Sequence, residues 1–189
     1  MAKGPPSGTP EPNPPIAPTL EGVPPAQQVR SGNVPKPGSR NPDLSDKMLG
    51  DFRILRRLGQ GGMAEVELGQ LASKNGQDPE VKKFGQMMVS EHGKANAELK
   101  TLAGKKNWTM PTDIGSHKST MDKLQGLKGA DFDKAYVDEM VSDHEKDLKA
   151  FQQQGQSGAD PELKEFAAKT ATVIQKHLDA IKAIQAKMK

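Results

Sequence analysis

The stretch DPEVKKFGQMMVSEHGKANAELKTLA, residues 78–103, decides the fold class of this chain. It opens with Asp78-Pro79-Glu80, in which aspartate is a good helix cap, proline fits the first helical position and an acid favours the first turn. Apolar residues then recur at intervals of three and four, the spacing that gives a helix one buried face. The stretch therefore predicts a long amphipathic helix over residues 79–105.

The same opening returns nearer the C-terminus, where DPELKEF at 160–166 closely matches DPEVKKF at 78–84. A second pair, MVSEH at 88–92 and MVSDH at 140–144, also indicates internal repetition. Long helices joined by short connections favour an antiparallel bundle. With Asp113 or Ser116 starting a short helix and Asp131 capping another, we expect helices at 44–74 (bent or broken around its glycines), 79–105, near 117–127, 131–154 and 161–187.

The composition agrees with a helical protein and excludes several classes. Aromatic residues make up only 4% of the 189 residues, which disfavours a β-rich fold. There is no cysteine, so disulfides, zinc ribbons and thiol catalysis are excluded. The net charge is +3 with lysines alternating with acids, so we expect no nucleic-acid partner, and no apolar run is long enough for a transmembrane segment.

The N-terminal part has a different composition. Residues 1–43 hold 12 of the 15 prolines and few apolar residues, which predicts a disordered Pro-rich tail. Its first residues contain no apolar signal region, so the chain as written is predicted to be cytoplasmic.

A short segment after this tail resembles the start of bacterial eukaryotic-like Ser/Thr kinases. LGDFRILRRLGQGGMAEV, within residues 44–66, matches the strand and Gly-rich loop that cover ATP in those enzymes, although Ala64 replaces the third glycine. No catalytic lysine, His-Arg-Asp loop or Asp-Phe-Gly motif follows, so this segment is not expected to transfer phosphate. We treat residues 44–62 as a kinase-like remnant that continues into the first helix.

Four further segments together resemble the bacterial family called domain of unknown function 4142. The resemblance implies a ferritin-like bundle over residues 63–189, a periplasmic or exported location and no established activity. The stretch QGGMAEV at 60–66 fits both this family and the kinase pattern, so we hypothesise that the chain is a fusion joined there. The four segments are GGMAEVELGQLA (61–72), residues 78–103 quoted above, FDKAYVDEMVSDHEKDLKAF (132–151) and DPELKEFAAKT (160–170).

Three histidines fill gaps in the apolar stripes of three different helices. His92, His144 and His177 each occupy a position where the three-and-four spacing requires an inward side chain. Their distances from the helix starts place them within ~6 Å of one height, at ~1.5 Å per residue. Glu65 lies on the inward stripe of the first helix. The pattern predicts that these four side chains meet in the core.

Three imidazoles and a carboxylate form a candidate site for one transition-metal ion such as Fe, Cu, Zn or Mn. A dinuclear iron centre is not expected, because no histidine follows a glutamate by three residues. The alternative is a metal-free hydrogen-bond network among the histidines, Glu65 and Thr170. His117 is expected to be a surface or capping residue.

The sequence therefore predicts an all-α, ferritin-like antiparallel four-helix bundle with one extra short helix. As its function we predict metal binding or a stress-related role, without established catalysis. A purely structural or interaction bundle is the alternative, and an inactive kinase fragment is a remote one. Its partners and oligomeric state cannot be predicted from these residues.

Overall fold

The structure is a computed structural model that describes Met1 and residues 42–188. The predicted tail over residues 1–43 lies almost wholly outside this range. The described part consists of helices and their connections: α1 Pro42–Asn75, α2 Pro79–Lys105, the short 3-10 helix η1 Gly115–His117, α3 Lys118–Gln125, α4 Gly129–Ser157 and α5 Pro161–Lys187.

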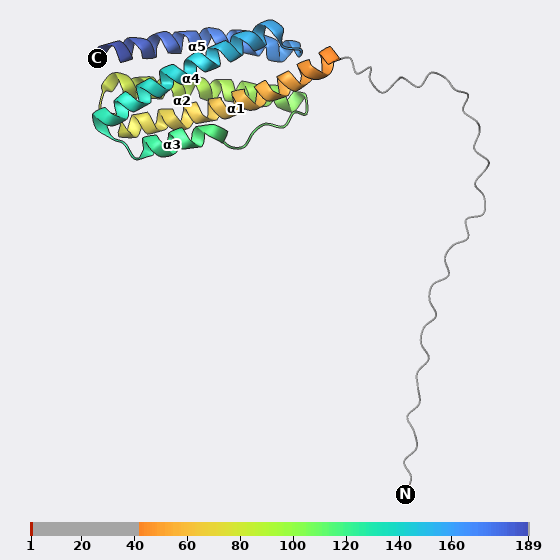
Figure 1. Ribbon diagram of the computed structural model, residues 1–189, viewed down its shortest axis with the longest axis horizontal. Coiled ribbons are helices and arrows are strands. Elements are labelled where there is room, and N and C mark those ends of the chain that lie inside the picture. Colours follow the sequence, from red (N-terminus) through yellow and green to blue (C-terminus); the bar gives the residue numbers. More distant parts are fainter. Residues whose placement is uncertain (2–41, 189) are drawn as a thin grey trace, which may run out of the picture. The chain divides into compact units, whose positions relative to one another are not determined.

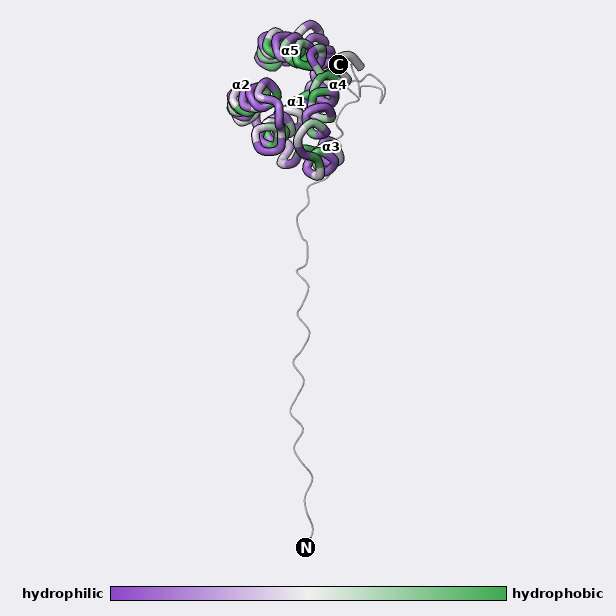
Figure 2. The backbone as a smooth tube through the Cα atoms, turned by 90° about the vertical axis from the view of Figure 1, so that its left-hand side faces the viewer, coloured by the Kyte–Doolittle hydropathy of each residue, from purple (hydrophilic) through white to green (hydrophobic). Residues whose placement is uncertain are grey.

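These helices form two antiparallel hairpins, α1 with α2 and α4 with α5, that pack against each other (Figure 1). Helix α1 lies beside α4 and α2 beside α5, and the connection from α2 to α4 carries α3 along the outside against α1 and α4. The end-on view in Figure 2 shows the four long helices grouped around a common centre. The predicted fold class, an all-α ferritin-like bundle with one extra short helix, is confirmed.

The two Asp-Pro-Glu motifs begin helices where the sequence predicts. The carboxylate of Asp78 accepts a hydrogen bond from the backbone N–H of Glu80 at 2.6 Å, and that of Asp160 accepts from Leu163 at 2.9 Å. The prediction that Asp131 caps the next helix is wrong. Helix α4 begins two residues earlier because Gly129 adopts a left-handed φ of +61°, which leaves Asp131 in the first turn.

The first helix is not broken at its glycines, contrary to expectation. Helix α1 runs without interruption through Gly59, Gly61, Gly62 and Gly69. These glycines allow other parts of the chain to approach the helix closely. A Cβ on Gly69 would lie 2.5 Å from the carbonyl oxygen of Gly85 on α2. Gly61, Gly62 and Gly69 are therefore sites of close approach to other helices, and Gly59 to the connection at Pro111, so that a larger side chain would be crowded there.

Each hairpin turn is capped by an aspartate from the other hairpin. Asp133 of α4 accepts hydrogen bonds from the backbone N–H groups of Gln77 and Asp78, at 3.0 and 2.7 Å. Asp51 of α1 accepts from the N–H of Asp160 at 2.8 Å and from the side chain of Gln154 at the same distance. We call these two arrangements the crossed caps.

The crossed caps reveal which of the sequence repeats is structural. Asp51 and Asp133 are separated along the chain by as many residues as Asp78 and Asp160, so the two hairpins repeat one pattern. The match between MVSEH and MVSDH has a different separation and joins α2 to α4. It therefore does not belong to the repeat of hairpins.

The core consists of two apolar clusters with a polar layer between them. One cluster contains Phe84, Met88 and Met140, and the other contains Leu99 and Phe151, among others. The first half of α1, including the kinase-like residues 44–62, supplies Leu55 and Leu58 to the second cluster. Among the described residues, no helix has an apolar stretch that could cross a membrane. The residues of the polar layer are Glu65, His92, His144 and His177.

Candidate metal centre

The three predicted histidines meet in the polar layer. His92 of α2, His144 of α4 and His177 of α5 are 9%, 1% and 2% exposed. One ring nitrogen from each lies within 4.8 Å of the corresponding nitrogens of the other two. Their ring centroids are 5.3 to 5.9 Å apart. We call this group the histidine triad, and its spacing leaves the three nitrogens close enough to share one ion.

Two of the imidazoles are each held by a hydrogen bond at one ring nitrogen, which leaves the other nitrogen for the triad. His144 Nδ1 lies 2.9 Å from the carbonyl oxygen of Met140, and His177 Nε2 lies 2.8 Å from a carboxylate oxygen of Glu91. Both partners are acceptors, so these nitrogens carry the protons. The opposite nitrogens are therefore lone-pair donors, the form that binds a metal.

Three ring nitrogens in the described part of the chain are buried without a hydrogen-bond partner. They are Nε2 of His92, Nε2 of His144 and Nδ1 of His177. A buried nitrogen without a partner costs about 1–3 kcal/mol, so three of them in one place are unusual. A bound ion would supply the missing partner to each.

The surroundings keep the triad uncharged. Burial, followed by the charges of His144 and His177, lowers the pKa of His92 to about 3. Burial, followed by the charge of His177, lowers the pKa of His144 to about 4. Burial also lowers the pKa of His177, although its bond to Glu91 opposes this. The ring of Phe84 packs against His144 at 6.0 Å between centroids. At neutral pH all three imidazoles are neutral and able to donate electron pairs.

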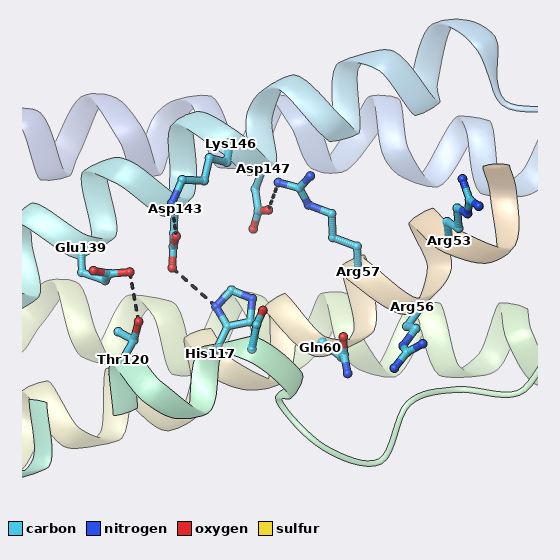
Figure 3. A pocket seen from close by; sticks show the side chains of 11 residues that line it. Arg53, Arg56, Arg57, Gln60, His117, Thr120, Glu139, Asp143, Lys146 and Asp147 are labelled. Atoms are coloured by element: carbon cyan, nitrogen blue, oxygen red, sulfur yellow. Dashed lines mark hydrogen bonds and ion pairs between the residues drawn. The ribbon is translucent and has the colours of Figure 1, made fainter. Parts of the chain in front are cut away.

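A pocket of about 470 Å³ opens on the surface where α1, η1, α3 and α4 come together (Figure 3). On its inner wall, Asp143 of α4 lies 3.6 Å from Nδ1 of His117 and 3.2 Å from the ammonium of Lys146. The Asp143 carboxylate raises the pKa of His117. His117 occupies the N-cap position of α3, but its ring makes no cap hydrogen bond there and pairs with Asp143 of α4 instead.

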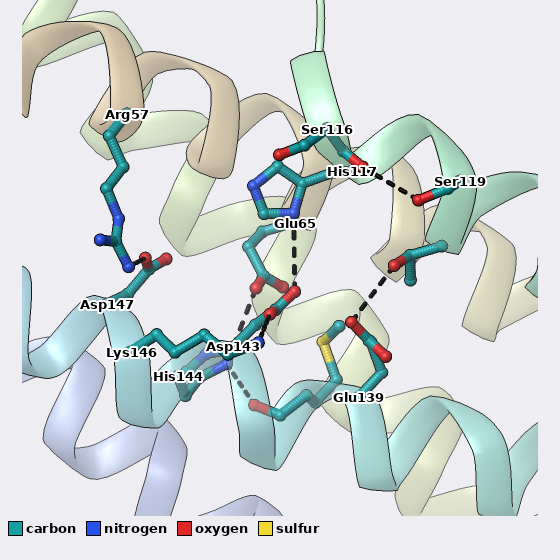
Figure 4. A network of polar contacts seen from close by, with 12 residues as sticks. Arg57, Glu65, Ser116, His117, Ser119, Glu139, Asp143, His144, Lys146 and Asp147 are labelled. Atoms are coloured by element: carbon teal, nitrogen blue, oxygen red, sulfur yellow. Dashed lines mark hydrogen bonds and ion pairs between the residues drawn. The ribbon is translucent and has the colours of Figure 1, made fainter. Parts of the chain in front are cut away.

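Glu65 lies between this pocket and the histidine triad. Its Oε1 is 3.7 Å from Nδ1 of His144, and its Oε2 is buried without a partner. Figure 4 shows Glu65 between His117 and His144. Burial, followed by the charges of Asp147 and Asp143, raises the pKa of Glu65 well above its ordinary value. Glu65 thus borders the outward nitrogen of His144, and the group of closely spaced donor atoms consists of the three histidines.

The alternative hydrogen-bond network is not formed as the sequence analysis describes it. The histidines make no hydrogen bonds to one another in the described structure, and Thr170 bonds to the carbonyl oxygen of Phe166 on its own helix. The acceptor for His177 is Glu91, which directly precedes His92. From the sequence, a carboxylate at that position could accept a hydrogen bond from a metal-bound histidine only if its helix rotates slightly, and the spacing did not indicate which helix it would reach.

Comparison with solved structures shows similarity of fold. Among curated proteins no sequence matches it. Two crystal structures share its fold, a DUF305 protein from Streptomyces coelicolor and a DUF305 fragment from Deinococcus radiodurans. The first superposes with a TM-score of 0.64 at 13% identity, over 74% of this chain and 93% of the other. The second gives 0.64 at 10% identity, over 73% and 96%.

The family is shown by a direct sequence match. The model of the domain of unknown function DUF4142 matches residues 36–184. This range includes α1, α2 and α4, all of α5 except its last three residues, and with them the histidine triad and Glu65. The match also covers the kinase-like residues 44–62. The chain belongs to the DUF4142 family.

Proposed function

We propose that this bundle binds one transition-metal ion through His92, His144 and His177. The observation that carries the proposal is a cluster of three buried histidines, in which one ring nitrogen of each lies within 4.8 Å of the others and each ring has a nitrogen without a hydrogen-bond partner. Hydrogen bonds from the opposite nitrogens of His144 and His177 support it, because metal-bound histidines usually donate such a bond to a carboxylate or carbonyl.

The donor set favours some metals over others. Neutral imidazole nitrogens suit Zn, Cu, Fe and Ni, whereas Mn prefers carboxylates and water. With only histidines in the closely spaced group, we expect Zn or Cu to bind more tightly than Mn. Three histidines leave a coordination position open, and Glu65 or a water molecule could fill it. A small void of about 10 Å³ beside His92 has room for roughly one water.

The competing function is a structural bundle in which the histidines only fix the alignment of the helices. The test is the metal content of the purified chain after incubation with Zn, Cu, Fe and Mn and thorough desalting, measured by elemental mass spectrometry. We expect about one ion per chain, lost in the double variant His92→Ala and His144→Ala. His117→Ala is the matched control, because His117 lies outside the triad, and it should retain the ion.

Circular dichroism must show that the variants remain helical. A folded wild-type protein that retains none of the four metals would contradict metal binding and leave the structural role. Retention of the ion by the double variant would show that the ion binds at other residues of the chain.

A further inference from the structure

In the surface pocket described above, the acidic side chains are more deeply buried than the basic side chains that pair with them. The side chains of Asp143 and Asp147 are 8% and 17% exposed, whereas those of their partners Lys146 and Arg57 are 60% and 47% exposed. Figure 3 shows Asp143 and Asp147 along α4, with Arg53 and Arg56 toward the far end of the pocket. A cation that reaches the inner wall therefore meets carboxylates.

Asp147 connects this pocket to the histidine triad. It lines the surface pocket, and it also lines the small void of about 10 Å³ that borders His92. No other residue lines both spaces. Gly61 of α1 faces its carboxylate, and a Cβ there would lie 3.3 Å from Oδ2 of Asp147. The Asp147 carboxylate thus lies between the solvent and the nearest histidine.

Asp147 is also the counterpart of Glu65 in the repeated hairpins. The two acids are separated by as many residues as Asp51 and Asp133, so they hold equivalent positions on α1 and α4. Glu65 contacts His144, and Asp147 borders the void beside His92. Glu65 has a buried carboxylate oxygen without a partner. Two inward carboxylates therefore flank the triad on the side of the pocket.

We propose that the pocket between α1, α3 and α4 is the route by which a metal cation reaches the triad, and that Asp147 passes the ion from solvent to His92. This inference rests on the proposed metal-binding function. Asp147 acts here on the rate of uptake and is not one of the final ligands.

Arg57 controls access along this route. Its guanidinium lies 3.4 Å from Asp147 Oδ1, in the way of an incoming cation. The ion pair is partly exposed, and such pairs contribute little to stability, so Arg57 can move aside at small cost.

The experiment measures the uptake of Co²⁺ by the full chain in a stopped-flow instrument, using the visible absorption of nitrogen-ligated Co²⁺. For Asp147→Asn we expect association to slow by about tenfold with an unchanged dissociation constant, because removal of the focusing charge affects passage and not the bound state. Arg57→Gln, which leaves the carboxylate in place, should speed association. It keeps the route testable if Asp147→Asn does not fold.

Asp138→Asn is the matched control, since Asp138 lies on α4 outside the pocket and pairs with Lys134. An unchanged association rate in Asp147→Asn would overturn the route. A weaker dissociation constant with unchanged association would also overturn it, by making Asp147 a ligand or a structural residue. Absence of any Co²⁺ binding by the wild-type protein would be a failure of the metal-binding function itself, which is a distinct result.

Discussion

The hydrogen bond from His177 to Glu91 determines which ring nitrogen faces the other histidines. Replacement of Glu91 by alanine removes this acceptor and leaves the ring free to change tautomer. We expect metal affinity to fall about ten- to hundredfold, the usual effect of losing a partner of a metal-bound histidine. A competition titration with a chromophoric chelator measures it.

Glu98→Ala is the control, because Glu98 also lies on α2 and also pairs across to α5, with Lys169. It should bind metal like the wild type. Equal affinities for the wild type and Glu91→Ala would show that this hydrogen bond does not prepare the ring for a metal.

The lowered pKa values of the triad predict a pH-dependent stability of the metal-free protein. His92 and His144 titrate in the folded protein at about 3 and 4, below the ordinary value of 6.5. Between these pH values the unfolded chain binds more protons than the folded protein does. The contribution of the two histidines to stability is therefore fully present above about pH 6.5 and is lost as pH falls. From pH 7 to pH 5, each of the two histidines should lower the free energy of unfolding by on the order of 2 kcal/mol.

Urea unfolding of chelator-treated protein at the two pH values tests this, with His92→Gln as the comparison. Between pH 7 and pH 5, the free energy of unfolding of the variant should fall by on the order of 2 kcal/mol less than that of the wild type. The raised pKa of Glu65 acts in the opposite direction in both proteins, so it largely cancels in the comparison. An identical pH dependence in the two proteins would mean that His92 is not buried in its neutral form.

The positions of the histidines could be predicted from sequence because they interrupt a regular apolar stripe. Inward orientation and height along the bundle follow from helical spacing alone. The partners of the rings could not be predicted in this way. Glu91 reaches His177 across a helix interface, and Asp147 lines the void beside His92 only through the placement of α4 relative to α2. Such contacts depend on how each helix is rotated, which spacing within one helix does not determine.

At the level of helices, Gly69 and Gly85 set how closely α1 and α2 approach. A Cβ on Gly85 would lie 2.7 Å from the carbonyl oxygen of Gly69 and 2.8 Å from the Cβ of Ala72. Gly85→Ala should therefore lower the free energy of unfolding by about 1–3 kcal/mol through overpacking, although alanine is the better helix former.

Gly93, two turns further along α2, is the matched control. A Cβ there would meet nothing within 4 Å, so Gly93→Ala should raise the free energy of unfolding by about 0.5–1 kcal/mol. Urea denaturation of both variants provides the comparison. Destabilisation by both substitutions, or by neither, would contradict the assigned close approach.

The limits of the helices were predictable where capping residues mark them and less so where glycines do. The starts of α2 and α5 follow from Asp78 and Asp160. The end of α4 was placed too early, since Gly155 resembles a turn residue in sequence. In the structure α4 continues through Gly155 to Ser157. The glycine instead allows α5 to approach closely, since a Cβ on Gly155 would lie 3.0 Å from the Cα of Ala168. A sequence does not distinguish a glycine that ends a helix from one that allows another helix to approach.

For the whole molecule, the crossed caps join two hairpins that each bury only one face. Asp133→Ala should cost about 1–3 kcal/mol, because it leaves the N–H groups of Gln77 and Asp78 without acceptors. Asp131→Ala is the control in the same turn of α4, since Asp131 is exposed and should have little effect. Unfolding is followed by circular dichroism and by the fluorescence of Trp108.

The unfolding transitions seen by the two signals should coincide in the wild type, because the backbone N–H groups in the turn of each hairpin need an acceptor from the other hairpin. Separate transitions, or equal stability of the two variants, would show that the caps do not couple the hairpins.

The crossed caps also constrain the order in which the chain can mature on the ribosome. Asp51 emerges early, yet the backbone groups that it caps lie 108 and 109 residues further along. At about 5–20 residues per second, the first helix must wait roughly 5–20 s for them. During that interval α1 gains its neighbours α2, α3 and α4 in turn, and α5 is the last to arrive. The nascent chain therefore exposes part of its apolar core until its last helix has been synthesised.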